Sequence, residues 1–163
     1  MNIEQCYETY SDDIYKFIYF LTFNKQVAED LMQETFIKAF EAKHSFRNEA
    51  QISTWLHAIA KNHTYDYLKK KSNKYILPFG QMPEPANVQI SAEEVAHLEE
   101  DRKQLYVALS QLKYDFRVAI ILRKLEQKSI KETAQILKWS ESKVKNCTER
   151  GLIQLKKIIR GEH

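Results

Sequence analysis

The sequence has very few residues that interrupt helices. Its 163 residues include only three glycines and three prolines, and the prolines (Pro78, Pro83 and Pro85) lie together with Gly80. Glycine and proline are the strongest local breakers of regular structure, so long stretches without them favour helices. This scarcity predicts an all-α protein that is interrupted once, near the middle of the chain.

Cysteine and long apolar runs are also scarce. Cys6 and Cys147 lie far apart and show no spacing typical of zinc ligands, so we expect neither a disulfide framework nor a metal site. The first residues, MNIEQCYETYSDD, lack the basic start and apolar run of a signal peptide. No window approaches the roughly 18 apolar residues of a membrane helix. The expected compartment is therefore the cytoplasm.

Residue patterns typical of enzymes are missing from the sequence. His44, His57, His63 and His97 show no ligand spacing, and there is no glycine-rich phosphate loop. The few candidate carboxylate pairs lie on solvated helix faces, and a lone histidine is more often a surface or packing residue than a ligand. We therefore predict no catalytic residue and no cofactor.

The charge is divided unevenly along the chain. Residues 1–71 carry 9 basic and 10 acidic groups, residues 72–101 carry 1 and 6, and residues 102–163 carry 15 and 6. A solubilising surface does not explain such segregation, whereas a polyanionic partner for the last third does. The charge pattern therefore favours nucleic-acid binding by the C-terminal part.

Apolar spacing divides the first 71 residues into three helices. One begins at Ile3, a second extends from about Gln26 to Lys43, and a third begins at Ile52 and ends in three lysines. The polar stretch 45–51 is predicted to be a loop. These helices form the first predicted domain, residues 1–71.

The acidic segment 72–101 is predicted to be a flexible linker that becomes helical towards its end. Its proline-bearing part has little capacity to form a core. The second predicted domain, residues 102–163, is helical again, and Asp115 is a plausible N-cap for a helix that carries Val118, Ile121 and Leu122. The expected plan is two small helical domains joined by the linker.

Residues 128–157 have the pattern of a helix-turn-helix. Ser129 and Glu132 form a capping box before a short helix, and Lys138-Trp139 makes a brief connection. Ser140 is a second N-cap. The longer helix that follows buries Val144, Thr148 or Gly151, Leu155 and Ile158, and its opposite face is polar and basic. Such a helix is suited to the major groove, although a solvated helical hairpin has the same local pattern.

Two features of the first domain have a functional interpretation. Asp30, Gln33 and Glu34 fall on one exposed helix face, beside Leu31 as an apolar anchor, which is either a docking surface or an ordinary solvated face. Further on, Phe46 lies in a polar loop before a helix that carries Asn62 and lysines. Rings, amides and lysines together suit single-stranded DNA. We expect Trp55 to be a core residue, and we expect Phe46 rather than Trp55 to contact a DNA base.

These motifs resemble those of the extracytoplasmic function (ECF) sigma factors of the sigma-70 family, the promoter-recognition subunits of bacterial RNA polymerase. AEDLMQETFIKAF resembles the polymerase-docking motif of region 2, and FRNEAQISTWLHAIAKNHTYDYLKKK resembles the −10 recognition segment. Residues 109–157 resemble region 4, which binds the −35 element. The pattern SIKETAQ…WSESKVK…RGL looks closest to sigma X-like members of Gram-positive bacteria.

The resemblance implies a role for three groups of residues. The group that docks on the polymerase is Asp30, Leu31, Gln33, Glu34 and Phe36. The group that opens and reads the −10 element is Phe46, Arg47, Asn48, Asn62, Asp66 and Lys69. The group that reads the −35 element is Ser140, Glu141, Ser142, Lys143, Lys145, Asn146 and Arg150.

The resemblance also implies the partners. They are the β′ clamp and β flap of bacterial core RNA polymerase, promoter DNA, and an anti-sigma factor, often membrane-anchored, which would hold the chain at the membrane. The sequence departs from the family where Lys113 replaces a frequent proline, where Lys138 replaces a frequent glycine, and where two basic positions after Lys145 are missing. The missing charges predict weaker −35 phosphate binding by the late part of the helix.

Three other interpretations make different predictions. A self-sufficient DNA-binding regulator would bind duplex DNA tightly without polymerase, but it leaves the N-terminal motifs unexplained. A pure protein-interaction module would have no DNA footprint. An enzyme would need a constellation that the sequence lacks.

Overall fold

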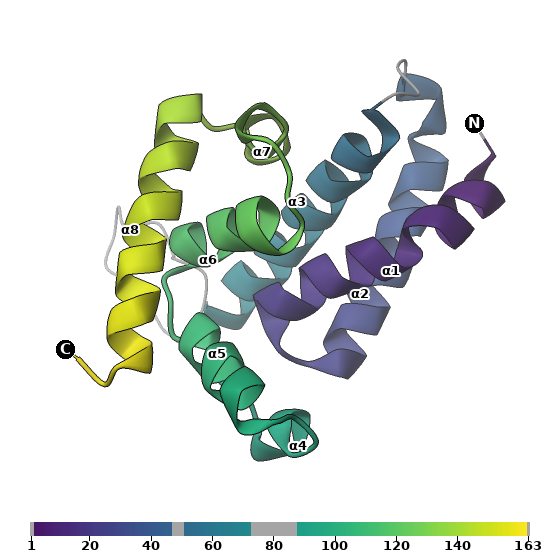
Figure 1. Ribbon diagram of the computed structural model, residues 1–163. Helices are drawn as coiled ribbons and strands as arrows, with labels where there is room; N and C mark the ends of the chain where they lie inside the picture. Colours follow the sequence, from purple (N-terminus) through teal and green to yellow (C-terminus); the bar gives the residue numbers. More distant parts are fainter. Residues whose placement is uncertain (1, 47–50, 73–87, 163) are drawn as a thin grey trace, which may run out of the picture.

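The computed structural model describes residues 2–46, 51–72 and 88–162, and every regular element in these ranges is helical. The predicted all-α class is therefore confirmed (Figure 1). No helix in the described part of the chain has the length and apolar character needed to cross a membrane. The elements are α1 (Ile3–Thr22), α2 (Lys25–Glu41), η1 (Lys43–Ser45), α3 (Ile52–Ser72), α4 (Ala92–Val95), α5 (Glu100–Ser110), α6 (Tyr114–Ile120), η3 (Ile121–Leu125), α7 (Ile130–Leu137) and α8 (Glu141–Ile159).

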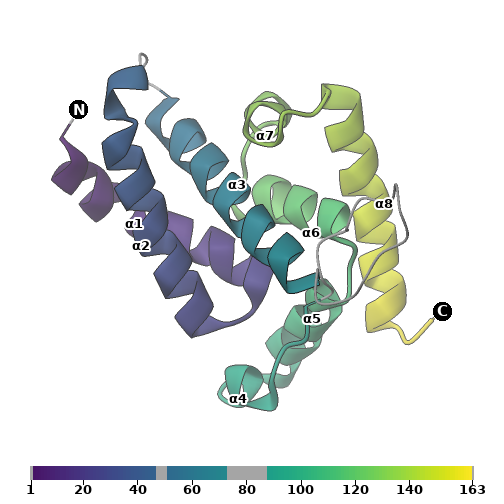
Figure 2. The same ribbon diagram turned by 180° about the vertical axis from the view of Figure 1, so that it is seen from behind.

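The N-terminal lobe consists of α1, α2 and α3, which all contact one another (Figure 2). Asparagine side chains begin the first two helices: the Asn2 Oδ1 atom accepts from the Glu4 N–H group at 2.9 Å, and the Asn24 Oδ1 atom accepts from the Val27 N–H group at 3.0 Å. Phe23 ends α1 in the left-handed region, with φ of 49°. The three helices predicted here are confirmed to within a few residues.

The C-terminal lobe consists of α5, α6, η3, α7 and α8, and it differs from the sequence prediction at two helix starts. Glu99 is extended, so the helix expected towards the end of segment 72–101 is divided into α4 and α5. Asp115 is not an N-cap, because α6 begins one residue earlier and its N-cap is Lys113. Asp115 lies instead in the first turn of α6, where a carboxylate interacts favourably with the helix dipole.

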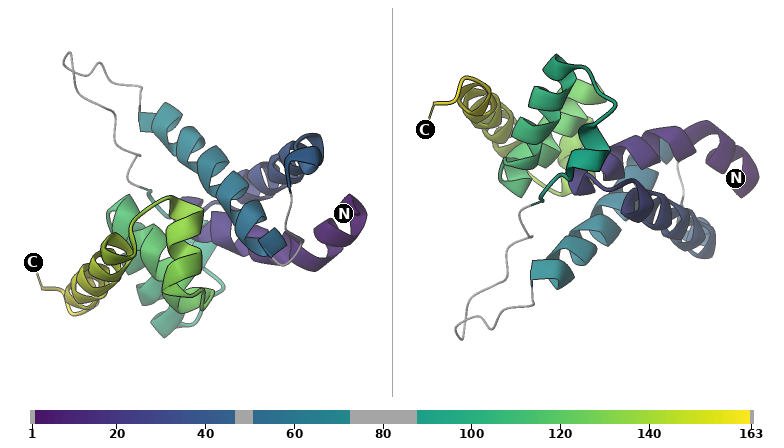
Figure 3. Two further views of the ribbon diagram at one scale, coloured as in Figure 1. Left: turned by 90° about the horizontal axis from the view of Figure 1, so that it is seen from above. Right: turned by 90° about the horizontal axis from the view of Figure 1, so that it is seen from below.

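The two lobes pack against each other in one continuous core (Figure 3). The Tyr106 ring of α5 lies 5.2 Å from the Phe20 ring and 6.0 Å from the Phe23 ring, both measured between centroids. The buried Arg117 of α6 donates from Nη2 to the Leu21 carbonyl oxygen at 3.2 Å. Burial lowers the pKa of Arg117 to about 10. The lobes are therefore joined by apolar and polar contacts.

The end of the predicted linker is attached to the N-terminal lobe. In α4, the Glu94 Oε1 atom accepts from the Lys25 N–H group at 3.0 Å, and the Tyr19 hydroxyl donates to Glu94 Oε2 at 3.3 Å. Burial and the Glu94 carboxylate raise the pKa of Tyr19. Residues 88–95 are thus fixed on the surface of the first lobe, and residues 73–87 lie outside the described residues.

Candidate polymerase and nucleic-acid interfaces

The predicted docking residues of α2 divide between surface and core. Asp30, Gln33 and Glu34 are exposed, whereas Leu31 and Phe36 are only 6% and 5% exposed. This division follows from the helical period, because residues three or four apart share a face. The three polar side chains therefore form the outer surface, and Leu31 and Phe36 fix the helix beneath it.

The exposed carboxylate Glu34 is in contact with α3. Its Oε2 atom contacts the Nε2 atom of His63, which is only partly exposed. Sequence reasoning missed this pair, since no local pattern connects two residues on different helices. It ties the predicted docking face directly to the helix that carries the predicted −10 residues.

An apolar groove of about 500 Å³ lies between α1 and α2, beside the docking face. Ile37 and Phe40 on α2 are 58% and 49% exposed, and Tyr7 on α1 is 41% exposed. The Tyr7 ring packs edge-on against the Phe36 ring at 5.0 Å between centroids. Exposed apolar side chains that gather in one place commonly mark a protein-binding surface. The groove was not predicted from the sequence, although the spacing of Ile37 and Phe40 is the signal that could have indicated it.

The predicted −10 residues lie around α3. The half-buried Phe46 ring lies 4.9 Å from the partly buried Trp55 ring, which packs against the core as expected. Asn62 and Asp66 are exposed one turn apart on α3, and the Lys69 Nζ atom lies 5.3 Å from the centroid of the Tyr65 ring. The predicted residues Arg47 and Asn48 lie outside the described residues.

The helix-turn-helix has the predicted caps at both helices. The Ser129 hydroxyl accepts from the Glu132 N–H group, and the Glu132 carboxylate accepts from the Ser129 N–H group, each at 3.0 Å. That backbone hydrogen bond is the main cause of the lowered pKa of Glu132. The Ser140 hydroxyl accepts from the Lys143 N–H group at 3.1 Å. Lys138, between the helices, has φ of 58°, the left-handed conformation that favours glycine.

Helix α8, the second helix of the helix-turn-helix, has two distinct faces. Val144, Thr148, Gly151 and Leu155 are buried, so both residues that the sequence left as alternatives are inward. The Lys143 Nζ atom is positioned 4.3 Å from the centroid of the Trp139 ring and 3.5 Å from Asp115 Oδ2. All the predicted −35 residues are exposed, namely Ser140, Glu141, Ser142, Lys143, Lys145, Asn146 and Arg150.

Comparison with known proteins agrees with both lobes. The chain matches the models of sigma-70 region 2 over residues 6–74 and sigma-70 region 4 over residues 102–155. It is 35% identical over 155 residues to the ECF RNA polymerase sigma factor SigX of Bacillus subtilis, covering 93% of this chain and 80% of that protein. The chain belongs to the ECF sigma factors. The ECF sigma factor SigM of the same organism is 30% identical, with 97% and 95% of the two chains covered.

The fold of this sigma factor is also that of a solved relative. The sigma factor RpoE of Bartonella quintana, solved in complex with the anti-sigma factor NepR, has a TM-score of 0.75 at 22% identity, with 98% of both chains covered. The predicted family, all-α class and function as an RNA polymerase sigma factor are therefore confirmed. The roles of individual residues stay predictions.

Proposed function

We propose that this sigma factor docks on core RNA polymerase through α2 and recognises a promoter at two elements, the −10 element with α3 and the −35 element with α8. The observation that carries the proposal is the exposure pattern of α8. Its capped N-terminus and outer face leave the seven predicted −35 residues in solvent, while its inner face packs against α6. A helix presented in this way is suited to the major groove.

The docking face supports binding to a protein partner. Asp30, Gln33 and Glu34 form a polar surface, and the groove beside it offers apolar area from Ile37 and Phe40. A polar rim around apolar contacts is the usual composition of a protein interface. We assign this surface to the polymerase clamp, and the flap of the polymerase to the C-terminal lobe.

The chemistry at the −10 element is binding and base capture. Trapping a base outside the stack costs a few kcal/mol, which the contacts of the captured base offset. Phe46 supplies an aromatic ring near Trp55, and Asn62 and Asp66 supply exposed hydrogen-bonding groups further along α3. The role needs neither a cofactor nor a covalent step by this chain.

Regulation by an anti-sigma factor is part of the proposal. The Bartonella quintana sigma factor was solved with such a partner. For this chain we infer an anti-sigma partner that competes with polymerase for the α1–α2 groove. We also infer a cytoplasmic location, with retention at the membrane when that partner is anchored there.

Run-off transcription tests the proposal. Core polymerase with this chain is expected to initiate at discrete sites on genomic fragments, and absence of initiation would remove the proposal. The variant Lys145→Ala/Asn146→Ala is expected to lose initiation at −35-dependent promoters and to keep core binding. Lys156→Ala/Lys157→Ala, at the other end of the same helix, is the control and should initiate normally. A factor that binds duplex DNA tightly without polymerase would instead be a self-sufficient regulator.

A further inference from the structure

Lys143 of α8 is engaged by two other residues of the C-terminal lobe. Its Nζ atom lies 3.5 Å from Asp115 Oδ2 and 4.3 Å from the centroid of the Trp139 ring. An ammonium group within about 6 Å of an aromatic face is attracted to the ring. The cation therefore has two attractive neighbours before any DNA is bound.

Both neighbours are placed by the local structure of the lobe. Asp115 lies in the first turn of α6, which packs against α8. Trp139 lies in the turn between α7 and α8, where its N–H group donates to the Ala134 carbonyl oxygen at 3.1 Å and its ring packs against the core. Lys143 follows the Ser140 cap and so belongs to the first turn of α8. The carboxylate and the ring are thus supplied by segments that pack on α8 or lead into it.

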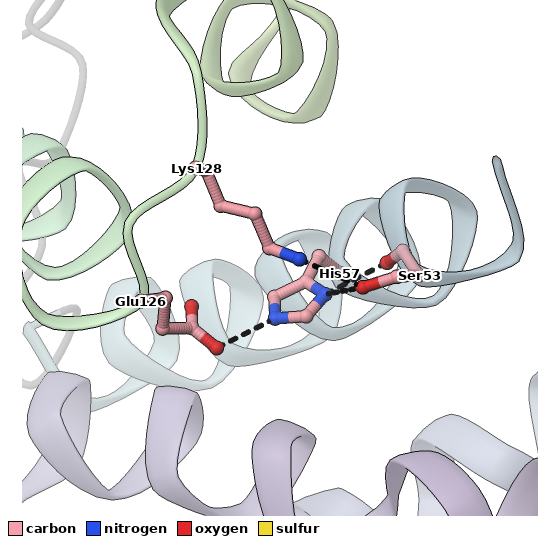
Figure 4. Close-up of polar contacts among 4 residues, drawn as sticks. All are labelled: Ser53, His57, Glu126 and Lys128. Atoms are coloured by element: carbon pink, nitrogen blue, oxygen red, sulfur yellow. Dashed lines mark hydrogen bonds and ion pairs between the residues drawn. The ribbon is translucent and has the colours of Figure 1, made fainter.

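Other acidic residues of this lobe are engaged away from α8. The Glu126 Oε1 atom lies 2.9 Å from Nε2 of the buried His57 ring on α3 (Figure 4). The Glu132 carboxylate closes the capping box of α7 at 3.0 Å. Asp115, by contrast, is paired with a lysine of α8. Its charge therefore acts on the helix that the proposed function assigns to DNA.

The influence of Asp115 extends further along α8. Burial raises the pKa of the Cys147 thiol, the Asp115 carboxylate adds to this effect, and the cations Lys143 and Arg150 oppose it. A carboxylate and two cations therefore lie around the second turn of the helix. A phosphate group brought to this part of α8 would meet the carboxylate as well as the cations.

The ion pair bears on DNA binding rather than on stability. The Lys143 and Asp115 side chains are 46% and 50% exposed, and an exposed ion pair contributes little to the stability of a fold. A lysine that binds a phosphate releases counterions and adds about 0.9 to the slope of log K against log salt. At Lys143 the phosphate would have to displace a carboxylate of like charge, so little affinity is gained.

We propose that Asp115 limits sequence-independent DNA binding by α8. Together with Trp139 it holds the Lys143 ammonium group, so that Lys143 makes no phosphate contact and recognition depends on the other exposed residues of the helix. Asp115 acts through Lys143 and is therefore a positioning residue. This inference rests on the proposed function, which assigns α8 to the −35 element.

The test measures binding of the polymerase complex to two DNA fragments of equal length, at about 50 to 200 mM salt. One fragment carries a promoter at which the wild type initiates, and the other carries none. Asp115→Asn and Asp115→Ser remove the charge, whereas Asp115→Glu keeps it. Glu162→Gln, exposed beyond the end of α8, makes the same change in net charge and is the matched control. Asp115→Asn/Lys143→Ala shows whether the effect passes through Lys143.

Asp115→Asn and Asp115→Ser should each steepen the salt slope by about 0.9, which at about 0.1 M salt corresponds to about eightfold tighter binding. The gain should be equal on both fragments, because a phosphate contact carries no sequence information. Asp115→Glu and the control should bind like the wild type. The double variant should also bind like the wild type, since the cation that would gain the phosphate is absent.

Two results would overturn the role of Asp115: both uncharged variants matching the control, or a gain that persists in the double variant. Weaker binding by both uncharged variants would also overturn it, because Asp115 would then orient Lys143 towards DNA. Lys145→Ala/Asn146→Ala separates this failure from that of the proposed function. If that variant weakens promoter binding while the Asp115 variants match the control, only the role of Asp115 is lost. If it also binds like the wild type, α8 does not read the promoter and both proposals fail.

Discussion

Gly151 of α8 lies so close to Ile120 of α6 that a Cβ atom on Gly151 would stand 2.9 Å from Ile120 Cδ1 and 3.0 Å from Phe116 Cβ. The second contact involves an atom fixed to the backbone, so it cannot move aside without shifting α6. Helix α8 is therefore held against α6 at a distance that suits glycine and is too short for a residue with a side chain.

Gly151→Ala should destabilise the fold. Overpacking lowers the free energy of unfolding by about 1–3 kcal/mol, and the better helix propensity of alanine offsets at most about 1 kcal/mol of this loss. Chemical unfolding measures the free energy of unfolding of each variant. Asn146→Ala, on the exposed face of the same helix, is the control, because it gains helix propensity without overpacking. A Gly151→Ala variant as stable as the control would show that α6 and α8 separate freely.

Lys138→Gly should stabilise the fold, because Lys138 is held in the left-handed region at φ of 58°. Relief of that strain should raise the free energy of unfolding by about 1 kcal/mol, once the entropy that glycine adds to the unfolded chain is subtracted. Lys131→Gly, within α7, should destabilise by about 1 kcal/mol. Thermal unfolding of both variants checks the sign, and a loss of stability in both would contradict the expectation.

The capping box at Ser129 should weaken in acid. The pKa of Glu132 is lowered in the fold, so its stabilisation is complete above the ordinary value of 4.5 and is lost as the pH falls through the lowered pKa. Because the pair is partly exposed, Glu132→Gln should cost only about 0.5 kcal/mol at pH 7. Urea unfolding should give wild type and variant the same stability near pH 2. A difference that is constant with pH would rule out a charge effect.

Lys145→Ala should lower the salt dependence of promoter binding by the polymerase complex. Loss of one phosphate contact reduces the slope of log K against log salt by about 1 and changes sequence preference little. Lys143 is already engaged by Asp115 and Trp139, so Lys143→Ala should have a smaller effect. Binding is measured from about 50 to 200 mM salt, with Lys156→Ala as the control. An unchanged slope for Lys145→Ala would remove its assignment to a phosphate.

Phe46→Ala and Asn62→Ala should impair promoter opening and leave polymerase docking intact. Opening is followed by permanganate reactivity of unpaired thymines, and docking by pull-down of core polymerase. Asp30→Ala/Gln33→Ala should give the reverse result, with docking lost first. Loss of core polymerase from Phe46→Ala would contradict the division between the two surfaces.

The elements that could be predicted from sequence are those that local chemistry determines. The capping box at Ser129, the cap at Ser140 and the left-handed turn at Lys138 each depend on residues within one helical turn. The exposed face of α8 likewise follows from its period. The prediction that Asp115 is an N-cap was wrong because α6 begins at Tyr114, one residue before it. No local pattern distinguishes these two possible starts of the helix.

The parts of the site that sequence missed depend on contacts between distant helices. His57 has the sequence context of an ordinary helix residue, yet it is buried because Glu126, far along the chain, meets it. Arg117 is buried because the Leu21 carbonyl oxygen at the end of α1 accepts from it. The contact between the lobes therefore could not be predicted from the sequence of either segment alone.

The hydrogen bonds of Glu94 determine how long the tether between the lobes is. While Glu94 holds α2, only residues 96–99 separate α4 from the C-terminal lobe, and five residue steps reach about 17 Å at most. If Glu94 and the apolar contacts of Val88, Ile90 and Val95 were all released, the chain between the lobes would run from the end of α3 at Ser72 to the start of α5 at Glu100, with a contour length of about 90 Å. The contacts of α4 and of the residues just before it therefore determine how much chain is free between the two lobes.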